Sequence, residues 1–258
     1  QKQKAQRLSG VKNKLPSFKT RAAFLERCLM EISERLKTVA SFVRTSRTIA
    51  DIGTDHGYIP IYLCLEEAID RAIACDVNRE PVRRAECNIN MYHLGNMIET
   101  RLGDGLKPLK AGEVEGAVIA GMGGMLIIEI LDECLEKTGT LNELVLQPQT
   151  DVDKVRKYLH KIGFMIDDEE MIYEDGIYYN VIRAVHGREK YDNEADYIFG
   201  KINIDRKNAI LKEFIEKEMA KNKKIMEKLK EAGTDNSQKR IRELEKYEKI
   251  CEGVYECL

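Results

Sequence analysis

The sequence predicts an α/β protein, with a doubly wound, mainly parallel sheet followed by a helical hairpin. Three observations carry this prediction. Five short apolar runs alternate with segments of helical period over residues 48–162, which is typical of a parallel sheet with helices on both faces. Two longer extended runs follow over residues 164–185. Beyond residue 186 the chain is highly charged and has narrow apolar seams of helical spacing.

The predicted strands are short apolar runs, each closed by glycine or by a polar residue. Such runs are typical of strands that are buried on both faces. Between them, apolar residues recur every three or four positions, as on one face of a helix. The predicted strands are Thr48–Gly53, Ala72–Val77, Ile98–Leu102, Ala117–Met122 and Leu144–Gln147, and the helices between them are Ile59–Leu65, Glu80–Met91, Met125–Leu135 and Val152–Ile162.

The predicted sheet is flanked by a helix before it and a strand hairpin at its end. Apolar spacings of three and four predict an amphipathic helix over Arg21–Val43. The extended runs Phe164–Tyr173 and Ile177–Val185 are joined by Glu174-Asp-Gly176, in which Asp-Gly supplies the positive φ of a hairpin turn. The sheet should therefore end in antiparallel strands.

The hairpin of helices is predicted from two apolar seams near the end of the chain. The seams run over residues 211–229 and 241–258, and the connection between them is predicted over 232–238. Lysines on the first helix, from Lys221 to Lys230, could follow a nucleic-acid backbone or form an ordinary solvated face.

Charge divides the chain into three predicted segments. Residues 1–24 hold seven basic and no acidic residues, and such an arm suits either contact with a polyanion or a disordered, solubilising tail. Residues 25–186 hold 18 basic and 28 acidic residues and are predicted to form the catalytic domain. Residues 187–258 hold 17 basic and 16 acidic residues and form the predicted helical hairpin.

Composition excludes several classes of protein. No apolar run approaches the roughly 18 residues of a membrane-spanning helix, so we expect a soluble protein without membrane contact. The seven cysteines have no CxxC spacing, which indicates reduced thiols in the cytoplasm. Neither a disulfide framework nor a metal site is expected.

Glycine and acidic residues follow the predicted strands where a ligand would bind in an open α/β sheet. Asp76, after the second strand, could accept both hydroxyls of a ribose, and Asp104, after the third, an adenine amino group. The loop Asp51–Gly57 lacks the G-x-G-x-x-G pattern of a nicotinamide dinucleotide site. These loops predict an adenosine cofactor, and the terminal strand hairpin is typical of seven-stranded methyltransferases.

Five stretches of the sequence resemble bacterial tRNA (adenine-22-N1)-methyltransferases of the TrmK type. The resemblance runs from about Leu25 to the chain end, and it implies a class I, Rossmann-like methyltransferase domain with an appended helical hairpin. The stretches are Ile32-Ser-Glu-Arg-Leu-Lys-Thr-Val-Ala40, Asp51-Ile-Gly-Thr-Asp-His-Gly-Tyr-Ile-Pro60, Gly103-Asp-Gly-Leu106, Ile119-Ala-Gly-Met-Gly-Gly124 and Gln147-Pro-Gln149.

The resemblance implies S-adenosylmethionine as the methyl donor and an adenosine of tRNA, at position 22, as the acceptor. Two features depart from the family: Gln149 stands where an Asn is usual, and the basic arm is longer. The implied donor contacts are Asp51, Gly53, Asp55, His56, Gly57, Asp76, Val77, Asp104, Gly105, Gly121, Met122 and Gly123.

Adenine N1 has an in-plane lone pair and reacts without losing a proton, so we expect catalysis by alignment and not by a general base. A carboxylate near the ring would stabilise the positive charge that methylation leaves there. Asp55 is our candidate for that carboxylate, the alternative being that it caps the following helix.

Four further side chains are candidates for the acceptor site. Tyr58 and Tyr179 could stack on the base, or they could be half-buried core residues. Gln147 could read the base edge or satisfy backbone groups at a strand end. Arg35 could meet a cofactor carboxylate or a phosphate, or lie in solvent.

Other functions remain open at this point. The same fold could methylate another RNA or a small molecule, or the chain could be a catalytically silent RNA-binding protein. An oxidoreductase is disfavoured because the loop after the first strand lacks the G-x-G-x-x-G pattern. The sequence does not specify an oligomeric state, and a monomer is compatible with it.

Overall fold

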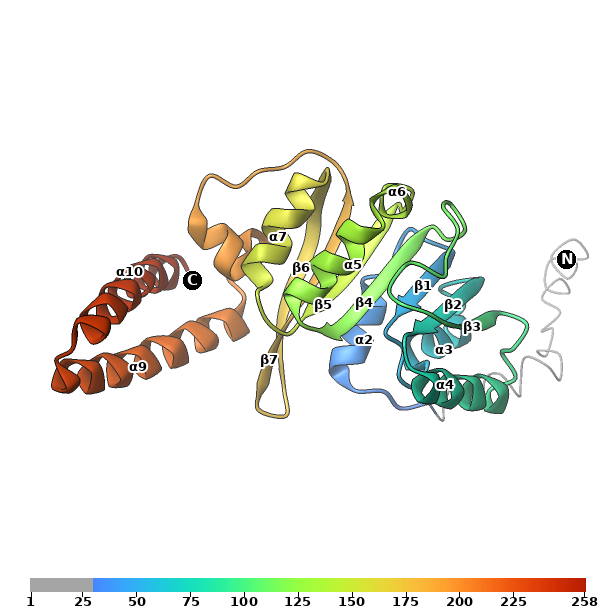
Figure 1. Ribbon diagram of the computed structural model, residues 1–258, viewed down its shortest axis with the longest axis horizontal. Helices are drawn as coiled ribbons and strands as arrows, with labels where there is room; N and C mark the ends of the chain where they lie inside the picture. Colours follow the sequence, from blue (N-terminus) through green and yellow to red (C-terminus); the bar gives the residue numbers. More distant parts are fainter. Residues whose placement is uncertain (1–29) are drawn as a thin grey trace, which may run out of the picture. The chain divides into compact units, whose positions relative to one another are not determined.

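The structure, a computed structural model, describes residues 30–258. These residues include a seven-stranded sheet of order β3-β2-β1-β4-β5-β7-β6 (Figure 1). Neighbouring strands from β3 to β5 are parallel, and β7 runs antiparallel to β5 and β6. The predicted fold class is confirmed. The strands are β1 (Thr48–Ile52), β2 (Arg71–Asp76), β3 (Ile98–Leu102), β4 (Gly116–Met122), β5 (Glu143–Pro148), β6 (Phe164–Glu174) and β7 (Ile177–His186).

Helices connect the strands and pack on the sheet. α5 and α7 contact each other, and their apolar side chains join those of the strands in the main core. α2 contacts α3, and α4 contacts β2 and β3. The helices around the sheet are α2 (Glu34–Ser41), α3 (Tyr58–Leu65), α4 (Arg79–Met91), α5 (Gly124–Glu133), α6 (Leu135–Thr138) and α7 (Val152–Lys161).

The five parallel strands begin and end within one residue of their predicted positions. The prediction succeeds because the central strands are buried on both faces, so that Ile49, Ala74, Ile119 and Leu146 are fully buried. Since β1 to β5 are parallel, their carboxyl ends meet at one edge of the sheet, and the loops that follow them lie together.

The strand hairpin β6–β7 also forms as predicted. Asp175 and Gly176 take φ values of 50° and 83°, and Glu174 pairs with Ile177 across the turn. At the tip, the Glu174 carboxylate accepts the backbone N–H of Arg35 at 3.2 Å. The turn therefore ties the end of the sheet to α2.

The helix predicted over Arg21–Val43 is confirmed for α2, Glu34–Ser41, and is wrong for residues 30–33, which are not helical. Ser33 is extended, and its hydroxyl accepts the N–H of Leu36 at 3.3 Å, which caps the helix. Met30 and Ile32, which precede the cap, are buried, so the apolar pattern extends beyond the N-terminal end of the helix. The basic arm, residues 1–24, lies outside the described residues.

The helical hairpin consists of α9 (Ala209–Ala232) and α10 (Asp235–Cys257). Its connection is shorter than the predicted 232–238, because the Thr234 hydroxyl accepts the N–H of Ser237 at 3.1 Å and starts α10 early. The base of the hairpin packs on β6 through a second core, formed by Met171, Ala195, Phe199, Leu211, Ile215, Cys251 and Val254.

Two short helices between the sheet and the hairpin were not predicted. The π-helix η1 (Asp196–Gly200) runs into α8 (Lys201–Asp205). The Arg156 guanidinium donates to the carbonyls of Tyr197 and Ile198 at 2.8 and 3.1 Å. Since a side chain from α7 satisfies these backbone groups, local sequence periodicity does not reveal the turn.

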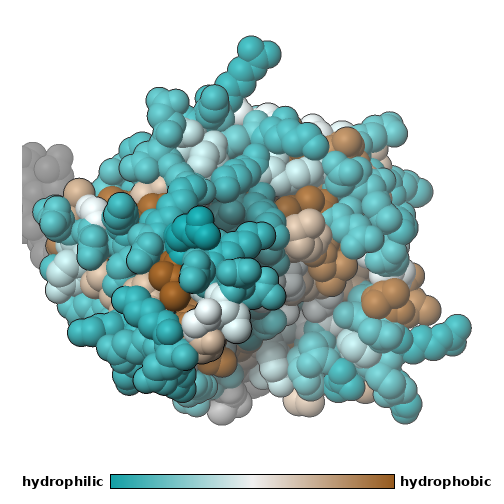
Figure 2. All heavy atoms as spheres, turned by 60° about the vertical axis from the view of Figure 1, so that its left-hand side comes forward, coloured by the Kyte–Doolittle hydropathy of each residue, from teal (hydrophilic) through white to brown (hydrophobic). Residues whose placement is uncertain are grey.

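Within residues 30–258, none of the helices is both long and apolar enough to span a membrane. In the same part of the chain, His, Cys, Asp and Glu side chains form no group of three that could hold a metal ion. On the face shown in Figure 2, hydrophilic side chains predominate and apolar ones form small, separate groups. That face thus offers no broad apolar surface.

Candidate active site

A pocket of about 390 Å³ opens at the carboxyl edge of the sheet, beyond β1 and β4 and beside α2. Eight of the residues predicted from the sequence line it, namely Arg35, Asp51, Gly53, Asp55, His56, Gly57, Tyr58 and Gly121. Five further lining residues were not among the candidates, namely Leu36, Thr54, Ile59, Ala120 and Gln149.

Backbone geometry explains why glycines form the floor of this pocket. Gly53 and Gly57 have φ values of 78° and 69°, which residues other than glycine rarely adopt. The N–H groups of Gly53 and Thr54 donate to the carbonyl of Cys75 at 2.8 and 2.9 Å, which ties the loop to β2. Gly121, with φ 77°, has no atom within 4 Å of the place where a Cβ would stand.

Asp51 is the buried acid of the pocket. It lies near the end of β1 and is 6% exposed. Burial, with a smaller contribution from the negative charge of Asp76 on β2, raises the pKa of Asp51 to about 6. Its carboxylate is therefore poised to accept hydrogen bonds from a polar ligand at neutral pH.

Asp55 stands at the mouth of the pocket, where two cationic or polar side chains contact it. The Arg84 guanidinium of α4 forms an ion pair with it, with Nε 3.1 Å from Oδ1. His56 Nε2 lies 3.4 Å from Oδ2. The alternative role as a helix cap is not adopted, because α3 begins after Gly57 and no side chain caps it.

The opposite wall of the pocket is built by Arg35 of α2. Its Nη1 donates to Gln147 Oε1 at 2.9 Å, and its guanidinium carbon lies 5.3 Å from the centre of the Tyr179 ring. Gln147 is fully buried and does not line the pocket. Gln147 and Tyr179 thus support Arg35 from β5 and β7.

Tyr58 and His56 form the remaining side of the mouth. Their rings are stacked, with centroids 5.0 Å apart and planes at 9°. Tyr58 is 40% exposed, so it is not a core residue. A flat aromatic surface therefore faces the outside of the pocket, as a base-stacking site requires.

Comparison with known proteins identifies the family. Residues 32–182 match a family described as a methyltransferase domain. The tRNA (adenine(22)-N(1))-methyltransferase of Bacillus subtilis is 33% identical to this chain over 83% of the chain and 93% of its own length. This chain belongs to the tRNA (adenine(22)-N(1))-methyltransferase family. The resemblance predicted from the sequence is confirmed.

Solved structures of tRNA methyltransferases agree with this membership. The B. subtilis m1A22 tRNA methyltransferase TrmK has a TM-score of 0.80 at 31% identity, covering 87% of this chain and 99% of that one. M. capricolum TrmK, solved with the cofactor product S-adenosyl-homocysteine, has a TM-score of 0.72 at 30% identity, covering 86% and 100%.

The remaining predicted residues of this methyltransferase lie at the same edge of the sheet but outside the pocket. Asp76 Oδ1 accepts the N–H of Asn78 at 2.7 Å, and Val77 is 60% exposed. Asp104 pairs with Lys107 at 2.6 Å, and Gly105 follows it with φ 51°. Their roles stay predictions.

The end of β4 lies against the glycine loop of the methyltransferase pocket. The Met122 methyl lies only 2.0 Å from where a Cβ on Gly53 would stand, so Met122 covers this glycine. Gly123 precedes α5, and the N–H of Gly124 donates to the carbonyl of Thr150 at 3.0 Å. Any side chain at Gly53 would have to displace Met122.

Proposed function

We propose that this chain transfers the methyl group of S-adenosylmethionine to N1 of an adenosine in tRNA, at position 22 as in its family. The observation that supports this most is the pocket, in which a glycine floor, a buried acid and an aromatic mouth meet at the carboxyl edge of a methyltransferase sheet. Its volume of about 390 Å³ falls within the usual range for small-molecule sites.

The residues at this edge fit S-adenosylmethionine. The open space at Gly121 lets a ligand approach the backbone. Asp51 would accept from its amino-acid part, Asp76 from its ribose hydroxyls and Asp104 from its adenine amino group. When bound, the cofactor supplies an electrophilic methyl group on a sulfonium.

The acceptor ring must be held in line with that methyl group. N1 lies on the Watson–Crick edge, so a paired adenosine has to leave its stack before it reacts. Tyr58, exposed at the pocket mouth, and Tyr179, beside Arg35, would hold the extruded base. No proton has to be removed from N1 before transfer.

Asp55 would stabilise the charge that forms on the ring. The methylated adenine carries a positive charge, and a carboxylate fixed nearby lowers the energy of the transition state that leads to it. Arg35, held by Gln147 at 2.9 Å, would meet an anionic group at the other wall. Among residues 30–258, one of its five side-chain N–H donors has a partner, and the others can meet a ligand.

A transfer assay tests the proposal directly. Labelled S-adenosylmethionine is offered with unmodified tRNA, with the same tRNA carrying guanosine at position 22, and with free adenosine. We expect 1-methyladenosine, identified by mass spectrometry, in the first reaction alone. Transfer to the guanosine variant would contradict the position, and transfer to free adenosine would favour a small-molecule acceptor. Cytoplasmic location stays a prediction from the sequence.

A further inference from the structure

A second, smaller depression lies beside the pocket. It has a volume of about 290 Å³ and shares His56 with the pocket. Its five other lining residues all come from one side of α4, namely Glu80, Arg83, Arg84, Cys87 and Asn88. The nearest feature of the catalytic pocket is the Asp55–His56 corner.

Two consecutive arginines give this depression its charge. Arg83 is exposed and makes no ion pair with any residue that the structure describes. Arg84 pairs with Asp55, but the two side chains are 45% and 62% exposed. Exposed ion pairs contribute little to stability, so Arg84 can change partner at small cost. Glu80 is the one acid among the lining residues, and the arginines outnumber it.

The depression is held at a fixed place relative to the pocket. Asn88 Nδ2 donates to the carbonyl of His56 at 2.9 Å. A Cβ on Gly57 would touch Ala85 of α4 at 3.4 Å, so α4 packs directly on the loop that follows β1. A group bound by the arginines would therefore lie at a set distance from the methyl-transfer site.

We propose that Arg83 and Arg84 bind a backbone phosphate of the RNA strand next to the adenosine that is methylated. Guanidinium groups match phosphate oxygens in a two-pronged geometry, and a flipped nucleotide brings its own phosphates to the pocket mouth. Arg84 would exchange the Asp55 carboxylate for the phosphate. The exchange leaves Asp55 free to face the ring that gains positive charge.

This inference rests on the proposed function, because it needs RNA at the pocket. A carboxylate of the cofactor is the other anion that two arginines could bind. Only His56 is shared between the depression and the pocket, and this separation favours the phosphate over the cofactor.

The test uses the full chain and three variants, Arg83→Ala, Arg84→Ala and the two combined. Arg71→Ala serves as the matched control, since Arg71 is also exposed and ion-paired, with Glu99 at 3.1 Å, but begins β2 at the amino edge of the sheet. We expect the double variant to raise KM for tRNA about tenfold, and to lower the slope of log KM against log salt by about one. The control should leave both unchanged.

Calorimetry with S-adenosylmethionine separates the two anions. Unchanged cofactor affinity in the double variant supports the phosphate, whereas weaker cofactor binding would overturn the proposal in favour of the carboxylate. Unchanged KM for tRNA would overturn it as well. If the native chain transfers no methyl group to tRNA, the proposed function fails. Direct tRNA binding by the same variants then still tests the arginines.

A folding defect is recognised by a conservative pair of substitutions. Arg83→Lys with Arg84→Lys keeps both positive charges, so it should restore the salt slope, while part of the tRNA affinity stays lost because an ammonium group cannot match a phosphate in two-pronged geometry. Thermal unfolding of every variant is measured alongside. Failure of the lysine pair to restore the salt slope, in a variant that is folded, would count against a phosphate contact.

Discussion

Ion pairs behave differently in two regions of this molecule, the pocket mouth and the far end of the sheet. At the mouth, Asp55 and Arg84 are 62% and 45% exposed. Below β6, Arg156 and Glu169 are both fully buried, with Nε 2.9 Å from Oε2. A buried pair has paid the cost of leaving water and keeps its geometry, whereas an exposed pair can exchange partners.

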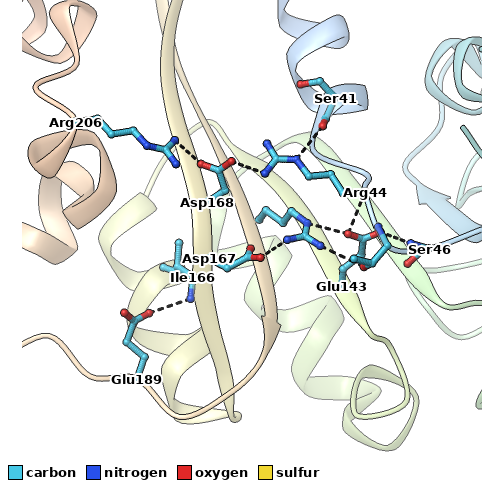
Figure 3. Close-up of polar contacts among 11 residues, drawn as sticks. Ser41, Arg44, Ser46, Glu143, Ile166, Asp167, Asp168, Glu189 and Arg206 are labelled. Carbon is cyan, nitrogen blue, oxygen red and sulfur yellow. Dashed lines mark hydrogen bonds and ion pairs between the residues drawn. The ribbon is translucent and has the colours of Figure 1, made fainter.

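The far end also holds a network of ion pairs around buried acids (Figure 3), in which Asp168 is 7% exposed while its partners Arg44 and Arg206 are 45% and 58% exposed. Asp168 of β6 accepts from Arg44, which follows α2, at 2.6 Å and from Arg206, which follows α8, at 2.5 Å. Burial would raise the pKa of Glu143, but hydrogen bonds from Ser46 and Arg183 hold it below its usual value. The network joins segments that are far apart in sequence, so its function is to hold the scaffold.

Removal of one partner of the buried pair should have the largest effect on stability. Arg156→Met leaves Glu169 buried without a cation and frees the carbonyls of η1, so we expect a loss of about 3–5 kcal/mol in the free energy of unfolding. Denaturant unfolding measures it. Arg84→Met, the exposed counterpart, should change it by about 1 kcal/mol or less.

A double variant tests whether the unpaired charge of Glu169 causes this loss. Arg156→Met combined with Glu169→Leu removes both charges and should recover much of the loss, because no unpaired charge stays buried. Equal losses in Arg156→Met and Arg84→Met would contradict the distinction between the two regions.

Replacement of the buried acid of the pocket, Asp51, should stabilise the protein, whereas replacement of Arg156 should destabilise it. Burial raises the pKa of Asp51 from 3.8 to about 6, so its ionisation costs folding free energy as pH rises from about 4 to about 6. Asp51→Asn removes that cost and should be more stable by up to roughly 3 kcal/mol above pH 6, but not at pH 4. Unfolding free energies of both proteins across this pH range test it. A difference that does not vary with pH would refute the assignment.

Asp55 should affect rate and not stability. For Asp55→Asn we expect a loss of about 100-fold in the single-turnover rate constant at saturating tRNA and cofactor, with a change of under about 1 kcal/mol in unfolding free energy. Asp104→Asn is the control, expected to weaken cofactor binding and to leave the saturated rate unchanged. A fully active Asp55→Asn variant would remove Asp55 from the mechanism.

Local patterns in the sequence predicted much of the fold and of the pocket, whereas long-range contacts were not predictable. Strands, their order along the chain and the loops at their ends follow from local patterns, so eight of the predicted site residues line the pocket. Gln149 lines it too and is noticeable in the sequence only as a departure from the family. For Gln147 the sequence left two roles open, and the structure agrees with the second, contact with backbone at a strand end: its Nε2 donates to the carbonyl of Pro148 at 3.4 Å. Its Oε1 accepts from Arg35, a contact over 112 positions that no local pattern contains.

Long-range contacts also limited the prediction outside the site. η1 depends on Arg156 and α8 on Glu169, whose Oε1 accepts the N–H of Ile202 at 3.0 Å. The pairing of Asp55 with Arg84 joins the loop after β1 to α4, two segments that the sequence presents as separate. Buried charges in the sequence look like any surface charge until the partners are known.

The smallest effect is expected at Lys107, which bridges Asp104 and Glu133 at 2.6 and 2.7 Å with all three side chains about half exposed. Because the bridge is open to water, Lys107→Gln should shift the thermal midpoint by no more than about 3 °C. The substitution also frees the Asp104 carboxylate, so cofactor affinity should stay the same or rise up to about fivefold. Calorimetry measures that affinity. A tenfold loss of cofactor affinity would mean that Lys107 positions Asp104 for the cofactor. An exposed ion pair at this edge would then hold its geometry as the buried pairs do.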